Sequence, residues 1–312
     1  MEASSAELEA QPLPALGARP GPAARATRNW SVRAGAFTVL LLVLASALAP
    51  WLVQLDPTLM DPVNRDLLPG ATATVTGQDG EARRYRFVMG TDGLGRDLYG
   101  RVLYGGRVSL SVGAAVAALS VTVGLFLGLL AGYLRRVDTV MMRVMDGVMA
   151  IPGILLAVTL VALWGGSLMT VILAIAIPEV PRVVRLVRSL VLSIREEPYV
   201  EAAVSVGTST TRLLSRHVLP NTLAPLIVQA SYICASAILA EAILGFLGVG
   251  IPPDVPSWGN VMSEGRLEFN EYPHNVFFPG LFVTLTVLAV NMLGDGLRDT
   301  LDPRFSRRGA AR

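Results

Sequence analysis

Residues 197–221, EPYVEAAVSVGTSTTRLLSRHVLPN, form a long polar segment between strongly apolar segments of the chain. We therefore expect this segment to lie in water beside a membrane. Its first half can be helical, because Pro198 is tolerated in a first helical turn and Glu201 complements the positive end of the helix. Gly207 is typical of a helix C-terminus, and the Thr and Ser residues that follow can begin a second short helix. Pro220 is expected to end that second helix.

Six positions in this segment have the spacing of a known motif. They are Glu201, Ala202, Ala203, Gly207, Leu219 and Pro220. The pattern resembles the EAA loop in permease subunits of ATP-binding-cassette (ABC) importers, although His217 stands where that loop has an aliphatic residue. Residues 216–221, RHVLPN, resemble the variant in the dipeptide, oligopeptide and nickel permease family, in particular the C-type subunit of peptide permeases.

The resemblance implies a mechanical role for the segment. In that family it is a coupling helix, which sits in a cleft of an ATPase subunit and transmits ATPase closure to the membrane spans. An amphipathic helix lying on the lipid surface is the alternative that the residues leave open.

The resemblance also implies an architecture and partners. The fold would be all-α and polytopic, with the six transmembrane helices of a type I ABC importer permease. The implied partners are a second homologous permease subunit, two ABC ATPase subunits, an extracytoplasmic solute-binding protein and membrane lipid. No cofactor is expected in this chain, because the ATPase subunits would bind ATP and magnesium, and no nucleic-acid partner is expected.

Composition independently indicates a polytopic membrane protein. The 312 residues are 52% hydrophobic and 16% charged, with a mean hydropathy of +0.54. All 26 basic residues are arginine, which excludes the lysine-dependent Walker A loop of an ATPase. With two histidines and one cysteine the chain lacks the residue sets of a hydrolase, so we expect a non-catalytic subunit without a metal site. Cys234 lies in an apolar run and is expected to be a packing residue.

The N-terminal third is expected to hold a tail, one span and an outer loop. Residues 1–28 are rich in Ala and Pro and are predicted to be a disordered cytoplasmic tail. Residues 29–106 would comprise the first span, at 34–55, and an extracytoplasmic loop. A signal peptide cleaved after Ala49 is the alternative, but the long preceding tail and Pro50 after the cut argue against it.

A second motif lies at the end of this loop. Residues 90–97, GTDGLGRD, resemble the motif before the second span in the peptide-permease branch; its key residues are Thr91, Asp92, Gly95, Arg96 and Asp97. Gly95 permits a tight turn, and Asp92, Arg96 and Asp97 can form a local cluster of ion pairs and hydrogen bonds. We expect a structural role, with substrate contact as the alternative. The preceding alternation of Tyr85, Phe87 and Met89 predicts a short strand.

Residues 107–297 are expected to form the permease core, with the coupling loop at 197–221, and residues 298–312 a cytoplasmic tail. Single spans are predicted at 108–134, 218–240 and 275–294. Residues 148–178 are predicted to form a hairpin of two helices with its tip at Gly165–Gly166. Its two helices would extend beyond the hydrocarbon through 141–147 and 180–192. Residues 135–143 would be a short cytoplasmic link. This topology places 18 of the 26 arginines inside, so we expect a bacterial inner-membrane protein with both termini cytoplasmic.

Small residues in the second span permit close helix packing. Gly124, Gly128 and Gly132 follow one another at four-residue steps. The contact they allow could be within the subunit or with a partner.

Charged residues near the spans raise further possibilities. Arg182, Arg185 and Arg188 share one helix flank and are expected to snorkel to the lipid headgroups, while Glu179 is expected to be paired rather than to carry protons.

Two residues are candidates for the translocation path. Glu241 could face the path or simply close its helix, and Trp258, in the run Pro-Ser-Trp-Gly, could be interfacial or face the substrate. An ion-gradient-driven secondary transporter is the alternative from a different class, although only Glu179 and Glu241 could serve it as proton relays.

Overall fold

The structure is a computed structural model that describes residues 29–76 and 82–301. The predicted tail at 1–28, and the predicted C-terminal tail from 302 onward, lie outside the described residues. The elements, in chain order, are α2 (Trp30–Ala47), α3 (Ala49–Leu52), η1 (Pro62–Asn64), β1 (Thr72–Thr76), β2 (Ala82–Arg86), α4 (Leu98–Tyr133), α5 (Arg135–Met149), α6 (Gly153–Trp164), α7 (Leu168–Arg195), α8 (Pro198–Ser205), α9 (Thr210–Leu213), η2 (Leu214–Val218), α10 (Leu219–Phe246), α11 (Trp258–Gly265) and α12 (His274–Leu301).

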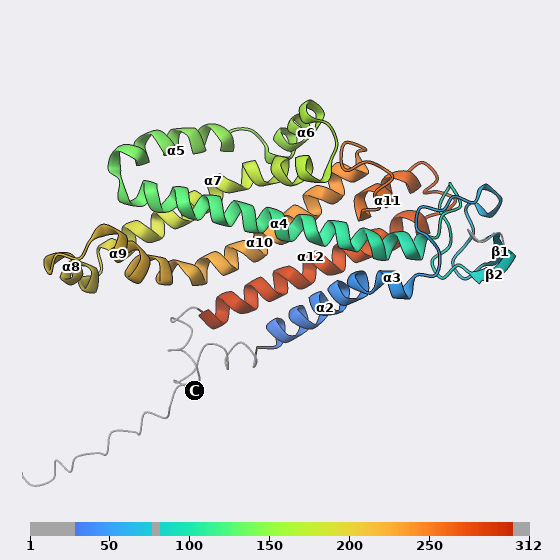
Figure 1. The fold of residues 1–312 in the computed structure, drawn as a ribbon, viewed down its shortest axis with the longest axis horizontal. Coiled ribbons are helices and arrows are strands. Elements are labelled where there is room, and N and C mark those ends of the chain that lie inside the picture. The colour runs from blue at the N-terminus through green and yellow to red at the C-terminus, as the bar shows by residue number, and fades with distance from the viewer. Residues whose placement is uncertain (1–28, 77–81, 302–312) are drawn as a thin grey trace, which may run out of the picture.

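Long helices lie side by side along one axis, with α4 packed against α7 and α10, and α12 between α10 and α2 (Figure 1). The short helices α8 and α9 lie at one end, which we call the α8 end. The antiparallel hairpin β1–β2, with Thr72 opposite Arg86, and helix α11 lie at the other, which we call the hairpin end. Helix α2 begins, and α12 finishes, toward the α8 end.

Four helices in the described residues are long and apolar enough to cross a membrane: α2, α4, the continuous helix from α9 through α10, and α12. Helices α5 and α6 make a fifth candidate crossing if the bent pair counts as one span. The chain is therefore a mostly helical membrane protein.

The glycines of α4 form a close seam with α7 of the same chain. The pairs are Gly124 with Val183, Gly128 with Val187, and Gly132 with Val191. A Cβ atom at Gly128 would lie 2.6 Å from the Cβ atom of Val187, which is closer than real Cβ atoms approach. The glycines thus serve packing within the subunit, one of the two possibilities that the sequence left open.

The segment predicted as a short link after α4 is instead the 15-residue helix α5, which is strongly amphipathic. The predicted helical extension through 141–147 required α5 to continue straight into α6. Instead, the two helices meet at an angle of 85°. Pro152 explains the break, since a proline disfavours helical geometry in the residue before it. The predicted hairpin tip is present, with Gly165 at φ +84°, and α7 includes the predicted extension at 180–192 and continues to Arg195.

The arginines of α7 are paired with carboxylates, a feature that the predicted snorkelling to headgroups did not include. Arg188 binds both carboxylate oxygens of Asp138, with 2.7 Å from Nη2 to Oδ2, and Arg185 donates a hydrogen bond to Asp146. Because both acids belong to α5, these pairs fasten α5 along α7.

Pro220 does not end a helix, contrary to the expectation from the sequence. The π-helical turn η2 precedes it, with the N–H of Leu219 bonded to the carbonyl of Leu214, and α10 runs on to Phe246. Proline lacks an N–H and clashes with a carbonyl one turn back, so the wider turn accommodates it at the start of α10.

Candidate functional site

The coupling motif folds into two short helices at the α8 end. Pro198 occupies the first turn of α8, and Gly207 follows its end with φ +77°, a conformation that favours glycine. The N–H of Thr208 bonds to the carbonyl of Ala203, which closes the turn. Ser209 then precedes α9. The turn thus has the geometry that its sequence predicts.

Side chains from three elements hold this unit in place. Thr210 is hydrogen-bonded to Tyr133 at the end of α4, with 2.8 Å between the hydroxyl oxygens. The Arg195 guanidinium lies 5.1 Å from the centre of the Tyr133 ring and donates to the carbonyl of Gly132 at 3.0 Å. The α8 end is therefore fixed to both α4 and α7, the two helices of the glycine seam.

His217, the departure from the aliphatic pattern, has a packing role. Its ring centre lies 6.1 Å from that of Tyr199 in α8. Asn221 donates to the carbonyl of His217 at 2.6 Å and to the Tyr199 hydroxyl at 3.3 Å. These contacts tie α8 to the beginning of α10.

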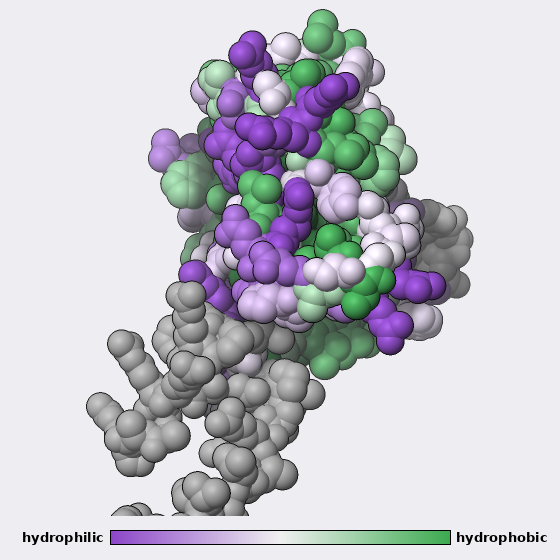
Figure 2. All heavy atoms as spheres, turned by 90° about the vertical axis from the view of Figure 1, so that its left-hand side faces the viewer, coloured by the Kyte–Doolittle hydropathy of each residue, from purple (hydrophilic) through white to green (hydrophobic). Residues whose placement is uncertain are grey.

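Most of α8 and the turn after it are exposed, and the exposed residues include apolar side chains. Val200 is buried, whereas Val204 and Val206 are 56% and 81% exposed, beside exposed Glu201 and Ala202. Figure 2 shows this end as a polar surface interrupted by hydrophobic residues. An exposed apolar patch with a charged rim is typical of a protein-binding surface.

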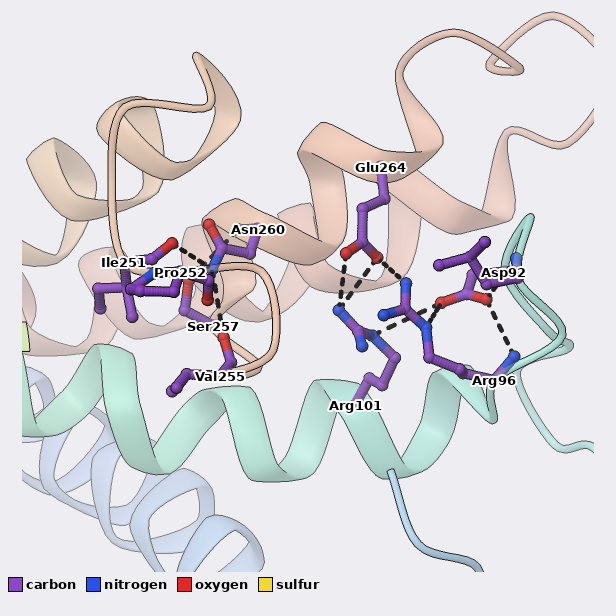
Figure 3. A network of polar contacts seen from close by, with 10 residues as sticks. Asp92, Arg96, Arg101, Ile251, Pro252, Val255, Ser257, Asn260 and Glu264 are labelled. Carbon is purple, nitrogen blue, oxygen red and sulfur yellow. Dashed lines mark hydrogen bonds and ion pairs between the residues drawn. The ribbon is translucent and has the colours of Figure 1, made fainter. Parts of the chain in front are cut away.

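The second motif forms a buried ionic network at the hairpin end (Figure 3). Asp92 accepts hydrogen bonds from Arg96 Nε at 2.7 Å and from the backbone of Leu94 and Arg96 at 2.9 Å. Arg96 also donates to Glu264 of α11, and Arg101 of α4 binds the same carboxylate at 3.0 Å. Arg101 is fully buried. The network joins the outer loop, α4 and α11.

Two members of this network, Arg101 and Glu264, were missed by sequence reasoning. Arg101 follows the motif by one helical turn, and Glu264 lies in residues 251–274, which hold four acids and one arginine. Pairing Arg96 and Arg101 with that acidic segment could have found them. Burial raises the pKa of Glu264, and the two arginines oppose the rise. The expected cluster is thus present for Asp92 and Arg96 and extends to Arg101 and Glu264, but the prediction that Asp97 joins it is wrong.

Asp97 lies outside the ionic network. Its carboxylate accepts a hydrogen bond from the backbone N–H of Gly100 at 3.0 Å and caps α4, and Tyr85 approaches it at 3.4 Å. Burial raises the pKa of Asp97 to about 6. Gly95 has a φ of +77° and lies so close to the Asp61 carbonyl that a Cβ atom has no room. The Thr91 hydroxyl donates a hydrogen bond to the Asn64 carbonyl at 2.7 Å. The motif therefore shapes the loop.

The two candidate path residues lie inside the packed subunit. Glu241 is 1% exposed and accepts a hydrogen bond from Ser109 of α4 at 2.7 Å. Trp258 is fully buried and its indole donates to the carbonyl of Val102 at 2.9 Å. Neither side chain faces an open surface of this chain. Trp258 is therefore neither an interfacial anchor nor exposed to substrate here, because α11 folds inward between α4 and α12.

Comparison with known proteins identifies the family. Residues 120–307 match the model of the family described as binding-protein-dependent transport system inner membrane component. The chain belongs to this family. The family resemblance predicted from the sequence is thus confirmed, and the protein is an inner-membrane transport component, which excludes the alternative of a gradient-driven secondary transporter.

Relatives cover most of the chain. It is 48% identical over 262 residues to a probable peptide ABC transporter permease protein of Sinorhizobium fredii, covering 84% of this chain and 85% of that protein. It is 42% identical over 278 residues to a di/tripeptide transport system permease protein of Pseudomonas aeruginosa, covering 89% of each. A glutathione transport system permease protein of Pectobacterium atrosepticum is 42% identical over 218 residues, covering 70% of this chain and 72% of that protein.

Proposed function

We propose that this permease subunit forms part of the membrane pathway of an ABC importer for dipeptides or oligopeptides. Its partners would be a second permease subunit, two ATPase subunits that hydrolyse ATP, and an extracytoplasmic solute-binding protein. The family description names dependence on a binding protein, and relatives at 42–48% identity carry names of peptide transport permeases. Peptide is therefore favoured over nickel, the alternative that the motif resemblance allows.

The six crossings of the proposal are α2, α4, the bent pair α5–α6, α7, α10 and α12. The α8 end would face the cytoplasm and the hairpin end the extracytoplasmic side. Arginine residues are more numerous at the α8 end of the molecule, which supports this orientation because arginine is enriched in cytoplasmic loops. Trp30 and Trp51, exposed by 72% and 79% at the two ends of α2–α3, have the positions expected for aromatic residues at the two membrane interfaces.

The observation that supports ATPase coupling most directly is that α8 is exposed, with Val204 on its surface, while side-chain contacts fix its unit to α4, α7 and α10. We propose that Glu201, Ala202, Ala203 and Gly207 contact the ATPase subunit, and that Leu219 and Pro220 carry the motion into α10. Nucleotide-driven closure would then tilt the spans that α8 is fixed to.

Solute-stimulated ATPase activity of the reconstituted complete importer tests this proposal. Gly207→Glu places a charged side chain at a backbone conformation that favours glycine, and Glu201→Lys reverses a charge on the exposed face, so both are expected to abolish stimulation without impairing membrane insertion. Ser215→Ala, at an exposed position of the same loop that is not one of the six motif residues, is the control. Wild-type stimulation in both motif variants would reject the coupling assignment.

A further inference from the structure

Helix α7 carries an exposed arginine halfway along its length. The Arg182 side chain is 57% exposed, and its Nη1 donates to the two carboxylate oxygens of Glu179 at 3.2 and 3.3 Å. Glu179 is 10% exposed at its side chain, and Ser236 of α10 lies 3.5 Å from its Oε1. These three residues form a polar cluster between α7 and α10, away from the coupling motif and from the hairpin-end network.

The packing of neighbouring helices gives the depth of this cluster. Val32, two residues into α2 from Trp30, touches Gly296 of α12, and Gly294 of α12 touches Ser231 of α10. At 1.5 Å per helical residue, Ser231 lies about 6 Å farther into the bundle than Trp30. Trp30, at the start of α2, is the residue that we place at the cytoplasmic membrane interface.

Ser236 lies five residues beyond Ser231 along α10, so it is about 13 Å inside the level of Trp30. Half the thickness of a bilayer hydrocarbon core is about 15 Å. Ser236 and Glu179 are therefore near the middle of the membrane. Arg182 is three residues from Glu179 toward the α8 end, which keeps it within the hydrocarbon depth.

The cluster lies on a side of the subunit that α4 does not cover. Ile238 and Glu241 of α10 face α4, where they contact Gly113 and Ser109. The side of α10 opposite to α4 carries residues at three- and four-residue steps: Tyr232, Ser236, Leu239 and Ile243. Of these, Leu239 is 45% exposed and Ile243 is 39% exposed. This open side is apolar toward the hairpin end and polar toward the α8 end.

Glu179 holds the Arg182 guanidinium at this depth instead of leaving it free to reach the headgroups, so a lipid-facing position would be costly. Charged residues at the centre of a bilayer cost several kcal/mol and almost always face a bundle interior or a water-filled cavity. The open side of α7 and α10 is therefore covered by water, by a partner subunit, or by both. In an importer, a polar surface of this kind at mid-membrane is where a charged solute can cross.

We propose that Arg182 binds a carboxylate of the solute during its passage across the membrane, with Glu179 and Ser236 as residues that position it. The bonds to Glu179 use Nη1, so the edge formed by Nε and Nη2 can present two parallel N–H donors to a carboxylate. A peptide with a free C-terminus supplies such a group. This inference rests on the proposed function for the choice of peptide, but the anion site itself follows from the geometry.

Thiol chemistry in the complete reconstituted importer tests the site. In a Cys234→Ala background, Ser236→Cys places a reporter thiol beside Glu179, the residue that Arg182 binds. We expect anionic sulfonatoethyl methanethiosulfonate to react faster than the cationic trimethylammonium reagent, and Arg182→Gln to slow the anionic reaction about tenfold because the nearby positive charge is lost. Arg185→Gln, which removes another half-exposed arginine of α7 that pairs with Asp146 instead, is the matched control and is expected to leave the preference intact.

Protection by solute tests the ligand class. With the binding protein and ATP present, dialanine is expected to slow modification of Ser236→Cys, whereas dialanine amide, which lacks the carboxylate, is not. Absence of reaction with either charged reagent would overturn the placement of the cluster on an aqueous path. The role of Arg182 would be overturned if the anionic reagent modified Ser236→Cys at the same rate with and without the Arg182→Gln substitution. Equal protection by dialanine and dialanine amide would also overturn it.

The outcomes also separate this inference from the proposed function. If the importer takes up no peptide, but the anionic reagent still depends on Arg182, the anion site stands and the peptide assignment fails. If peptide uptake is measured but the reagent rates do not depend on Arg182, the importer function stands and the site fails.

Discussion

At the scale of single residues, this permease has charged groups buried at the hairpin end that are held by specific partners. Arg101 is the most demanding of them, because its guanidinium is fully buried and depends on Glu264 and Asp92 for compensation. Removing one partner of a buried ion pair costs more than the pair itself contributes, since the remaining charge is left without compensation. The network therefore fixes the position of α11 more than it adds to stability.

We predict that Glu264→Ala lowers the free energy of unfolding by about 3 kcal/mol, because Arg101 and Arg96 lose a shared carboxylate. The measurement is thermal unfolding of the detergent-purified protein. Glu271→Ala removes an exposed carboxylate from the same outer segment and is expected to change stability little. Similar losses in both variants would contradict the role assigned to the network.

Asp97 gives a prediction with a defined pH dependence. Its folded pKa of about 6 lies above the ordinary value of 3.8, so the folded protein holds this proton more tightly than the unfolded chain does. The stability that protonated Asp97 contributes is present in full below pH 3.8 and is lost as the pH rises through about 6. Asparagine keeps an acceptor for the Gly100 N–H and carries no charge.

We therefore expect Asp97→Asn to raise the melting temperature relative to the wild type more at pH 8 than at pH 5. Asp97→Ala, which also removes the cap of α4, should be about 1 kcal/mol less stable than Asp97→Asn at both pH values, because neither variant carries a charge. Melting curves at the two pH values decide the question. A difference between wild type and Asp97→Asn that does not change with pH would show that Asp97 is not protonated preferentially by folding.

At the scale of helices, the seam between α4 and α7 depends on the absence of side chains at three positions. A Cβ atom at Gly128 would meet Val187 at 2.6 Å and the carbonyl of Val184 at 3.0 Å. Neither contact is with the flexible end of a side chain, so the helices have to separate to accept it. The same seam carries the contacts of the α8 end to the rest of the bundle.

We predict that Gly128→Ala destabilises the subunit by about 1–3 kcal/mol, as overpacking of a tight contact does. Gly147→Ala in α5 is the matched control, because a Cβ atom there has nothing within 4 Å. Alanine also favours a helix by up to about 1 kcal/mol over glycine, so the control should be neutral or slightly stabilising. Thermal unfolding of both variants gives the comparison, and a stabilising Gly128→Ala would refute the seam.

At the scale of the whole molecule, the α8 unit and the buried ionic network lie at opposite ends. The α8 unit is tied to α4 and α7 through Tyr133 and Arg195, and to α10 through Asn221. At the hairpin end, the ionic network and Trp258 connect α4 with α11. Helix α4 therefore links a cytoplasmic unit to an extracytoplasmic cap in the proposed orientation, and a tilt applied at one end is transmitted to the other.

The orientation can be measured with single cysteines in a Cys234→Ala background. Val63 in the outer loop and Val206 beside α8 are 90% and 81% exposed, so a thiol at either position is accessible. A membrane-impermeant maleimide is expected to label Val63→Cys and not Val206→Cys when applied from the extracytoplasmic side of spheroplasts. Inverted vesicles should give the opposite result. Labelling of Val206→Cys in intact spheroplasts would reverse the proposed topology.

Much of this protein was predictable from local sequence. The apolar runs predicted the long helices, Gly207 and Pro198 predicted the turn and start of the α8 unit, and the glycine steps of α4 predicted a close helix contact. These features depend on backbone geometry and on hydrophobic periodicity over a few turns, which neighbouring residues determine.

Tertiary structure alone decided which partners the polar residues take. The acids of α5 bind the arginines of α7, Glu264 completes the network of the outer loop, and Trp258 turns inward. Pro220 continues a helix because a π turn makes room for it. Apart from the π turn, which is local to Pro220, each outcome depends on groups from distant parts of the chain that meet only when the helices pack. A buried charge or ring is stable only where that packing supplies its partner.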